Sequence, residues 1–213
     1  MTIVLIDYGS GNLRSATKAF EHAVVETGMT SHVEVTENAA ALSNASHIVL
    51  PGVGTFGDCR AGLDALPGMA EALESEVTVK GKPFLGICVG MHLMAERGLE
   101  HGIHDGLSWI PGEVRALEPD NKTLKIPHMG WNQLDVVRPH PVLDGIGPGT
   151  HFYFVHGYEI VCAEQKHILT TSDYGGAVAS MVARDNLLGT QFHPEKSQDA
   201  GLRLIANFLR WQP

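Results

Sequence analysis

Short apolar runs alternate with amphipathic segments along the first hundred residues. Four segments are predicted to be strands, at residues 2–7, 31–37, 46–52 and 83–88. Residues 12–25 have apolar side chains at helical spacing, and residues 69–79 are compatible with a second helix. Apolar strands separated by helices are typical of a parallel sheet that is covered on both faces.

The pattern changes near residue 108. Closely spaced strands with hairpin-like breaks follow, at residues 108–117, 132–138, 151–161, 166–172, 177–185 and 187–193. Residues 198–211 are then amphipathic and predict a closing helix. We therefore expect an α/β fold in one domain, residues 1–213. Its central sheet should be mostly parallel and flanked by helices, with antiparallel strands added in the C-terminal half.

The segment 83–94 changes from an apolar strand to a helical pattern at Cys88, with Gly86 two residues before it and Gly90 two residues after it. A nucleophile on a sharp strand-to-helix turn needs such small neighbours. The N-terminus of the following helix would favour a thiolate, and the N–H of Val89 would point toward an oxyanion. The alternative is a buried structural cysteine after a strand.

A base for this thiol is found near the C-terminus. His193 follows an apolar strand, and Glu195 stands two residues later beyond Pro194. In an extended segment these two side chains share one side, so the carboxylate could orient the imidazole. The chain has 12 histidines, so His193 alone could equally be a loop residue.

The strand at 46–52 runs into a glycine-rich turn, Pro51-Gly52-Val53-Gly54. Glycines on both sides of Val53 would let its backbone N–H turn into the site as a second oxyanion donor. The alternatives are a simple turn or a phosphate cradle. The Lys-Ser/Thr pair of a P-loop is absent.

Composition and charge argue against several classes of function. The formal net charge is −9 without a cluster of basic residues, which argues against nucleic-acid binding, and no apolar run approaches a membrane span. Three cysteines and a start that does not resemble a leader peptide suggest a reducing cytoplasm, with Cys59 and Cys162 as core or loop thiols. His101 to Asp105 has a possible metal-binding spacing without a second cluster, so we expect no metal and no cofactor.

The elbow "GICVGM", the distal "HPE" and the "PGVG" strand end together resemble the triad (class I) glutamine amidotransferases. Five further pieces are similar to the glutaminase subunits of imidazole glycerol phosphate synthases and extend the resemblance over nearly the whole chain: "DYGSGNL", "LPGVGTFGD", "IPHMGWN", "FYFVHGY" and "QFHPEKSQ". This resemblance implies the class I glutamine amidotransferase fold.

The resemblance also implies a chemistry. Cys88 would attack the side-chain amide of glutamine, His193 would move the proton and Glu195 would orient His193. The N–H groups of Val53 and Val89 would hold the oxyanion. Ammonia would pass to a cyclase subunit with a (β/α)8 barrel, which makes imidazole glycerol phosphate and AICAR in histidine biosynthesis.

Two alternatives keep the same chemistry: a glutaminase subunit of another synthase, or a stand-alone γ-glutamyl cysteine hydrolase. A non-catalytic relative is a third alternative, and it would be expected to lack a member of the triad.

By position, the resemblance assigns glutamine binding to Gly54, His92 and Glu100. The family usually has Gln where this chain has His92, and often Ser or Thr where this chain has Gly157.

The resemblance further implies a heterodimer whose partner is the cyclase subunit. The docking surface is expected in loops near the site, and its candidate residues are Asn12, Met129, Trp131, Asn132 and Lys196. The alternative for Trp131 is a core position. The glycines around Val53 also suggest that partner binding aims the oxyanion donor.

Overall fold

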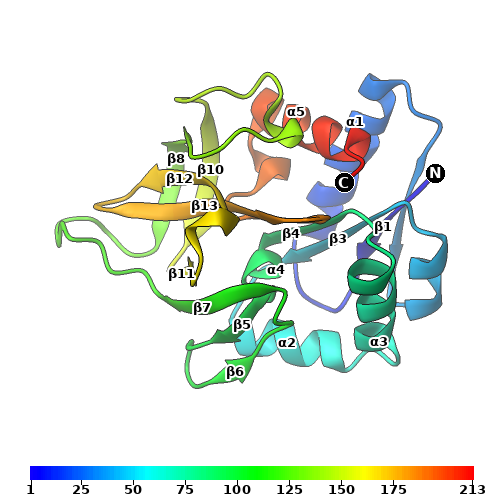
Figure 1. The fold of residues 1–213 in the computed structure, drawn as a ribbon, viewed down its shortest axis with the longest axis horizontal. Coiled ribbons are helices and arrows are strands. Elements are labelled where there is room, and N and C mark those ends of the chain that lie inside the picture. The colour runs from blue at the N-terminus through cyan, green and yellow to red at the C-terminus, as the bar shows by residue number, and fades with distance from the viewer.

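A central sheet of eight strands organises the fold (Figure 1). The computed structural model describes all residues, 1–213. In spatial order the strands are β2 (His32–Thr36), β1 (Thr2–Ile6), β3 (His47–Gly52), β4 (Phe84–Cys88), β14 (Leu187–Thr190), β13 (Ala177–Arg184), β12 (Ile168–Asp173) and β9 (Asp135–Val136). From β2 to β14 neighbouring strands are parallel, and from β14 to β9 they are antiparallel. The expected mixed sheet is therefore confirmed.

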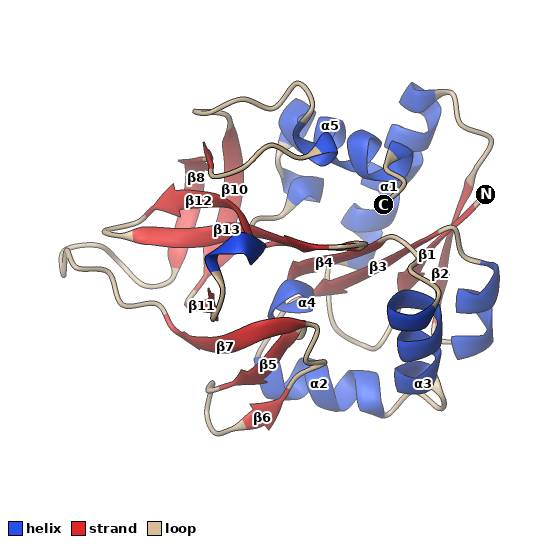
Figure 2. Ribbon diagram, viewed as in Figure 1, coloured by secondary structure: helices blue, strands red, loops and turns tan.

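Helices cover both faces of the parallel half (Figures 1 and 2). On one face lie α1 (Leu13–Thr27) and α5 (Gln198–Arg210), and on the other lie α2 (Phe56–Asp64) and α3 (Met69–Leu73), which continues as a π-helical turn (Glu74–Val79). Short helical turns are α4 (Val89–His92), η1 (Ala39–Asn44), η3 (Pro141–Leu143), η4 (Gln165–His167) and η5 (Pro194–Lys196). No helix has both the length and the apolar character needed to cross a bilayer.

Two smaller sheets flank the C-terminal half. One pairs β8 (His128–Gln133) with β10 (His151–His156). The other has the order β11 (Tyr158–Cys162), β7 (Ile110–Ala116), β5 (Ala95–Gly98) and β6 (His104–Asp105).

The predicted apolar stripe of α1 is the face that enters the core. Ala16, Phe20 and Ala23 are fully or almost fully buried, and Phe20 meets Phe208 of α5 edge to face with ring centroids 6.5 Å apart. Burying one phenylalanine of this kind contributes roughly 1.5–3 kcal/mol. Packing of α1 on α5 thus covers one face of the sheet. It also fixes the position of η5, which lies just before α5.

The register of the three central strands determines where the site forms. Gly52, at the end of β3, pairs with Cys88 at the end of β4, and Thr190 of β14 pairs with Ile87. All three strands are parallel, so the segments that follow them leave the sheet at the same edge. This brings residues 53–54 and 191–195 to either side of Cys88.

The structure corrects the helix expected after Cys88. Helix α4 ends at His92, and β5 begins at Ala95. Val89, Leu93 and Met94 have helical spacing, but all three are buried because protein surrounds this segment on every side. In a segment with no solvent face, apolar periodicity does not distinguish a helix from a buried turn.

Two further elements differ from the expectations. Residues 128–132 are part of strand β8 rather than a loop, and the aromatic-rich strand β10 provides their pairing partner. Helix α2 follows the glycine-rich turn and was not predicted. Its N-cap is Thr55, whose hydroxyl accepts from Asp58 N–H, a local signal in "TFGD".

Tight packing at Gly90 generates a stability prediction. A Cβ atom on Gly90 would lie 1.8 Å from the carbonyl oxygen of Leu50, which belongs to β3. We expect Gly90→Ala to lower the free energy of unfolding by about 3 kcal/mol or more, because backbone must move to admit the methyl group. Urea unfolding followed by circular dichroism measures the change.

Gly147→Ala is the matched control, because no atom lies within 4 Å of its Cβ position. Equal stability of the two variants would contradict the close approach of Gly90 to β3.

Candidate active site

Cys88 lies on a strained turn between β4 and α4. Its backbone has φ 54° and ψ −111°, a conformation that L-residues rarely adopt. Such strain costs of the order of 1–3 kcal/mol and persists only where the surroundings enforce it. The enforcement is visible at Gly86, where a Cβ atom would lie 2.5 Å from the carbonyl oxygen of Gly90. The expected nucleophile elbow is thus present in its geometry.

The helix after Cys88 has only four residues, Val89–His92. A single turn has a smaller dipole than the longer helix that the sequence suggested. A thiolate at this position would therefore need stabilisation from other groups around the sulfur as well.

His193 and Glu195 form a buried pair. His193 Nδ1–H donates to Glu195 Oε1 at 2.8 Å, and only 2% and 3% of the two side chains are exposed. The sequence argument for this pair assumed an extended chain, whereas Glu195 lies in the 3₁₀ turn η5, which begins at Pro194. The predicted contact is present, and its local geometry is a turn rather than a strand.

The surroundings of His193 change its acidity. Burial alone would lower the pKa of His193, but its interactions with Cys88 and Glu195 raise the pKa to about 9. At neutral pH the ring is therefore an imidazolium, whose charge favours negative charge on the neighbouring sulfur. Nε2 of His193 is buried and lacks a partner within hydrogen-bonding geometry, although the ring is close enough to Cys88 for their interaction to shift its pKa.

The backbone of Val53 is held by side chains on the far side of the glycine-rich turn. The carbonyl oxygen accepts from the Ser10 hydroxyl, and the Cys59 thiol points at the same oxygen from 3.6 Å. The N–H of Val53 points at Ser10 Oγ, 3.4 Å away. In this structure, then, the expected oxyanion donor Val53 interacts with Ser10.

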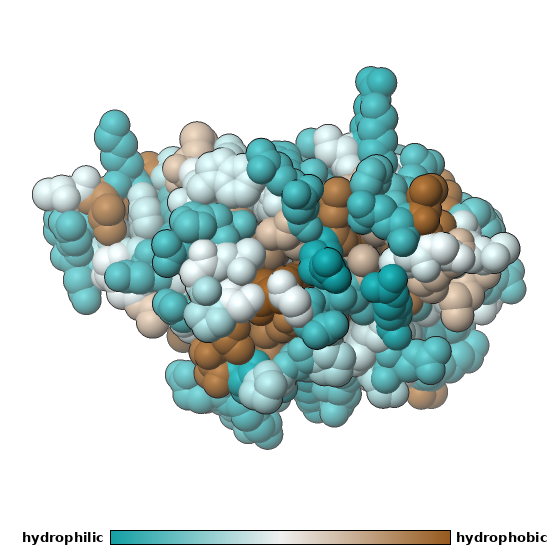
Figure 3. Space-filling model, turned by 90° about the horizontal axis from the view of Figure 1, so that it is seen from above, coloured by the Kyte–Doolittle hydropathy of each residue, from teal (hydrophilic) through white to brown (hydrophobic).

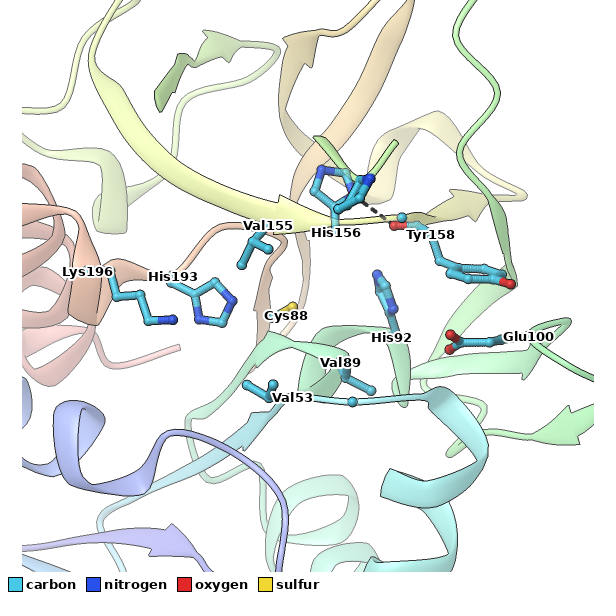
Figure 4. Close-up of a pocket in the computed structure, with 13 residues that line it drawn as sticks. Val53, Cys88, Val89, His92, Glu100, Val155, His156, Tyr158, His193 and Lys196 are labelled. Atoms are coloured by element: carbon cyan, nitrogen blue, oxygen red, sulfur yellow. Dashed lines mark hydrogen bonds between the residues drawn. The ribbon is translucent and has the colours of Figure 1, made fainter. Parts of the chain in front are cut away.

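A cavity of about 220 Å³ opens beside Cys88 (Figure 4). Its walls include all three members of the expected substrate set, Gly54, His92 and Glu100, together with Cys88 and His193. Glu100 also has a structural role, because its Oε2 accepts from Phe56 N–H at the start of α2, 2.7 Å away.

Gln191 is a site residue that sequence reasoning missed. It is fully buried, and its amide lies between Cys88 and His92: Nε2 is 4.0 Å from Cys88 Sγ, and Oε1 is 2.8 Å from His92 Nε2. The available signal was its position two residues before His193, at the same strand end.

His156 and Tyr158 also line the cavity without having been predicted. His156 Nδ1–H donates to the Tyr158 carbonyl, and its Nε2 accepts from His128 Nδ1–H at 3.0 Å. Burial lowers the pKa of His156 to about 3, so its ring is neutral. His128 Nε2 in turn accepts from the amide of Asn132.

The residues expected at a partner surface separate into two groups. Met129 and Trp131 point outward from β8, with 63% and 48% of their surface exposed, so the core alternative for Trp131 is wrong. Lys196 is exposed and lies 5.9 Å from the ring centre of Tyr153, which packs against Trp131. Asn132, by contrast, is half-buried and also donates to the Asp173 carbonyl.

Asn12 lies at the N-terminus of α1 and is half-buried, without a side-chain cap bond. The face seen in Figure 3 is mostly hydrophilic, and the largest of its apolar areas lies below and left of the centre. The structure contains no cluster of three or more His, Cys, Asp or Glu residues that could hold a metal ion.

Comparison with known proteins agrees with this geometry. The sequence pattern of the family described as "Glutamine amidotransferase class-I" matches residues 4–211. The chain belongs to the class-I glutamine amidotransferases.

Several curated relatives match this amidotransferase over its entire length. "Imidazole glycerol phosphate synthase subunit HisH" of Brucella suis is 55% identical over 216 residues, covering 100% of both chains. The protein of the same name from Rhodospirillum rubrum is 55% identical over 214 residues, again with full coverage of both. The chain therefore also belongs to the HisH family, and the resemblance proposed from the sequence is confirmed.

Solved structures support the fold of this amidotransferase. A crystal structure titled as glutamine amidotransferase superposes with a TM-score of 0.71 at 18% identity, covering 97% of each chain. A glutamine amidotransferase from Thermotoga maritima gives a TM-score of 0.65 at 17% identity, covering 92% of this chain and 76% of that one.

The coupling between Cys88 and His193 is testable. We expect Cys88→Ala to lower the pKa of the His193 ring below about 9, because the interactions with the thiol that raise it are lost while burial remains. The same variant should lose glutamine hydrolysis by about 10⁴-fold or more. An NMR titration of the His193 ring and an activity assay measure the two effects.

Cys162→Ala, in β11, is the control and should leave both quantities unchanged. A His193 pKa that is the same with and without the Cys88 thiol would contradict the coupling.

Proposed function

We propose that this chain is the glutaminase subunit of an imidazole glycerol phosphate synthase, and that it hydrolyses glutamine to glutamate and ammonia for a cyclase partner. The observation that carries the proposal is the buried His193–Glu195 pair beside the strained Cys88, in a chain that is 55% identical along its full length to proteins named as that subunit.

In the first half-reaction, the Cys88 thiolate attacks the side-chain amide carbon of glutamine, and the carbonyl oxygen becomes an oxyanion. His193, as imidazolium, donates its proton to the amide nitrogen. The carbon–nitrogen bond breaks, ammonia leaves, and a γ-glutamyl thioester remains on Cys88. The hydrogen bond to Glu195 keeps the ring oriented throughout.

In the second half-reaction, the now neutral His193 takes a proton from water. The resulting hydroxide attacks the thioester, the thiolate leaves, and glutamate is released. The imidazolium–thiolate pair is thereby restored. The raised pKa of His193, about 9, suits this resting state.

Oxyanion stabilisation is proposed for the N–H groups of Val53 and Val89. The Val53 N–H now points at Ser10 Oγ, so it must turn away from Ser10 before it can serve the oxyanion. The peptide that carries this N–H joins Gly52 to Val53, and a glycine at its start tolerates the change of backbone angles that a rotation of the peptide requires. We therefore propose that the chain alone is a slow glutaminase and that partner binding activates it.

Ammonia released into water would be protonated at neutral pH and lose its nucleophilicity, so a partner should cover the site. For the docking surface we propose Met129, Trp131 and Lys196, with Tyr153 added. Asn12, at the start of α1, is proposed as a further polar contact. The amide of Asn132 is committed to His128 and Asp173, which suits a role beneath this surface.

We further propose that residues 1–213 act as one glutaminase domain in the cytoplasm, without a cofactor. A single cluster of 56 buried apolar residues supports one domain. Three cysteines without a disulfide fit a reducing compartment.

The proposal is tested by measuring glutamine hydrolysis for the chain alone and for its complex with a cyclase partner and the cyclase ligand. We expect at least about ten-fold faster hydrolysis in the complex, because an oxyanion donor contributes more than one factor of ten. His193→Ala should lose this activity in the complex, whereas product formation from added ammonia should persist. Loss of the ammonia-dependent reaction as well would contradict a role in glutamine chemistry.

Ser10→Ala tests the restraint on Val53. Removing this hydrogen-bond partner should raise hydrolysis by the chain alone by about five-fold, the value of one ordinary hydrogen bond. Ser43→Ala, in η1, removes a hydroxyl bonded to the Ala40 carbonyl and is the control. A Ser10→Ala chain as slow as the wild type would show that Ser10 does not hold the donor back.

A further inference from the structure

The triad chemistry makes no use of the buried pair formed by Gln191 and His92. Gln191 is 0% exposed and His92 is 3% exposed, and they are joined by a 2.8 Å hydrogen bond. Gln191 continues from β14, where its N–H donates to the Ser180 carbonyl on β13. The amide is therefore anchored to the central sheet while its head group reaches the nucleophile.

The orientation of the Gln191 amide follows from the sulfur atom beside it. An amide presents an NH2 donor at one end and an oxygen acceptor at the other. Sulfur is an acceptor for the NH2 end, which is the end found 4.0 Å from Cys88 Sγ. The oxygen then faces His92 Nε2, and only a protonated Nε2 can donate to it.

The ring of His92 is neutral. Burial lowers the pKa of His92 to about 4, and the hydrogen bond to Gln191 only partly opposes this effect. A neutral ring with its proton on Nε2 has a bare lone pair on Nδ1. His92 lines the cavity, and its ring uses Nε2 for the bond to Gln191, which leaves Nδ1 for a ligand.

A second acceptor lies along the same wall. In the view of Figure 4, His92 stands between Cys88 and Glu100. Glu100 uses Oε2 to bind Phe56 N–H, which leaves Oε1 for another donor. Glutamine with its amide at Cys88 carries an α-ammonium at the opposite end of the molecule. An ammonium has three donors and no acceptor, which matches a carboxylate and a bare imidazole nitrogen.

We propose that Gln191 is a positioning residue that fixes the tautomer of His92, so that His92 Nδ1 accepts a hydrogen bond from the α-ammonium of bound glutamine. This inference rests on the proposed glutaminase function. It also accounts for the presence of His92 where related chains usually have Gln: in this tautomer His92 offers an acceptor, as an amide oxygen does.

The first test reads the tautomer without any assay. In nitrogen-15 NMR spectra of the folded chain, His92 Nδ1 should resonate as an unprotonated nitrogen and Nε2 as a protonated one. In Gln191→Met the two tautomers should mix, because the methionine side chain has a similar length and no amide. A protonated Nδ1 in the wild type, or an unchanged tautomer in Gln191→Met, would overturn the proposal.

The second test uses two substrates of the complex, glutamine and glutaric acid monoamide, which has the same amide and carboxylate but lacks the α-ammonium. The preference for glutamine, as a ratio of kcat/KM values, should fall about ten-fold in His92→Phe, the value of one hydrogen bond to a charged group. It should fall by a smaller factor in Gln191→Met and survive in His92→Gln. Gln165→Met, in η4, is the control and should keep the wild-type ratio.

The outcomes separate the two proposals. A wild-type complex that does not hydrolyse glutamine at all contradicts the proposed function. A complex that hydrolyses glutamine, with an unchanged preference in both His92→Phe and Gln191→Met, contradicts this inference alone.

Discussion

Parallel pairing of β4 with β3 on one side and β14 on the other is the constraint on which the site depends. Cys88 pairs with Gly52, and Ile87 pairs with Thr190, so three strands end at one level. A slip of one residue in either pairing would turn alternate side chains to the other face of the sheet. Cys88, the turn that holds Val53 and the segment that holds His193 meet because of this register, and close backbone packing at Gly90 enforces it.

The polar groups that are buried around Cys88 differ in their charge and in their contacts with the sulfur. The one-turn helix α4 supplies only a weak dipole, so in the proposed mechanism His193 carries the positive charge that a thiolate needs, and its hydrogen bond to Glu195 holds the ring in place. Gln191 approaches the sulfur from β14 with its amide. His92 and His156 are also buried beside the cavity, but burial lowers the pKa of each far enough to keep them neutral. In the proposed mechanism, a single imidazolium beside two neutral histidines directs proton transfer to one ring.

Much of the fold and of the site could be predicted from the sequence. The glycines flanking Cys88 and the His193–Glu195 spacing are local patterns set by local backbone requirements, and both led to the observed contacts. The parallel strands were predicted because their apolar runs are continuous. The contacts of Ser10 with Val53 and of Gln191 with His92 join residues that are 43 and 99 positions apart, and no local pattern encodes them. The short α4 was missed because a fully buried segment has no polar face to mark its period.

The central claim is that Cys88, and not either of the other thiols, is the nucleophile that this register exposes to glutamine. The most direct test is to treat the complex with a diazoketone analogue of glutamine and locate the adduct by peptide mass spectrometry. The account predicts one adduct per chain, on Cys88, with Cys59 and Cys162 unmodified because they are buried away from the cavity. An adduct on Cys59 or Cys162, or full inactivation with Cys88 unmodified, would contradict it.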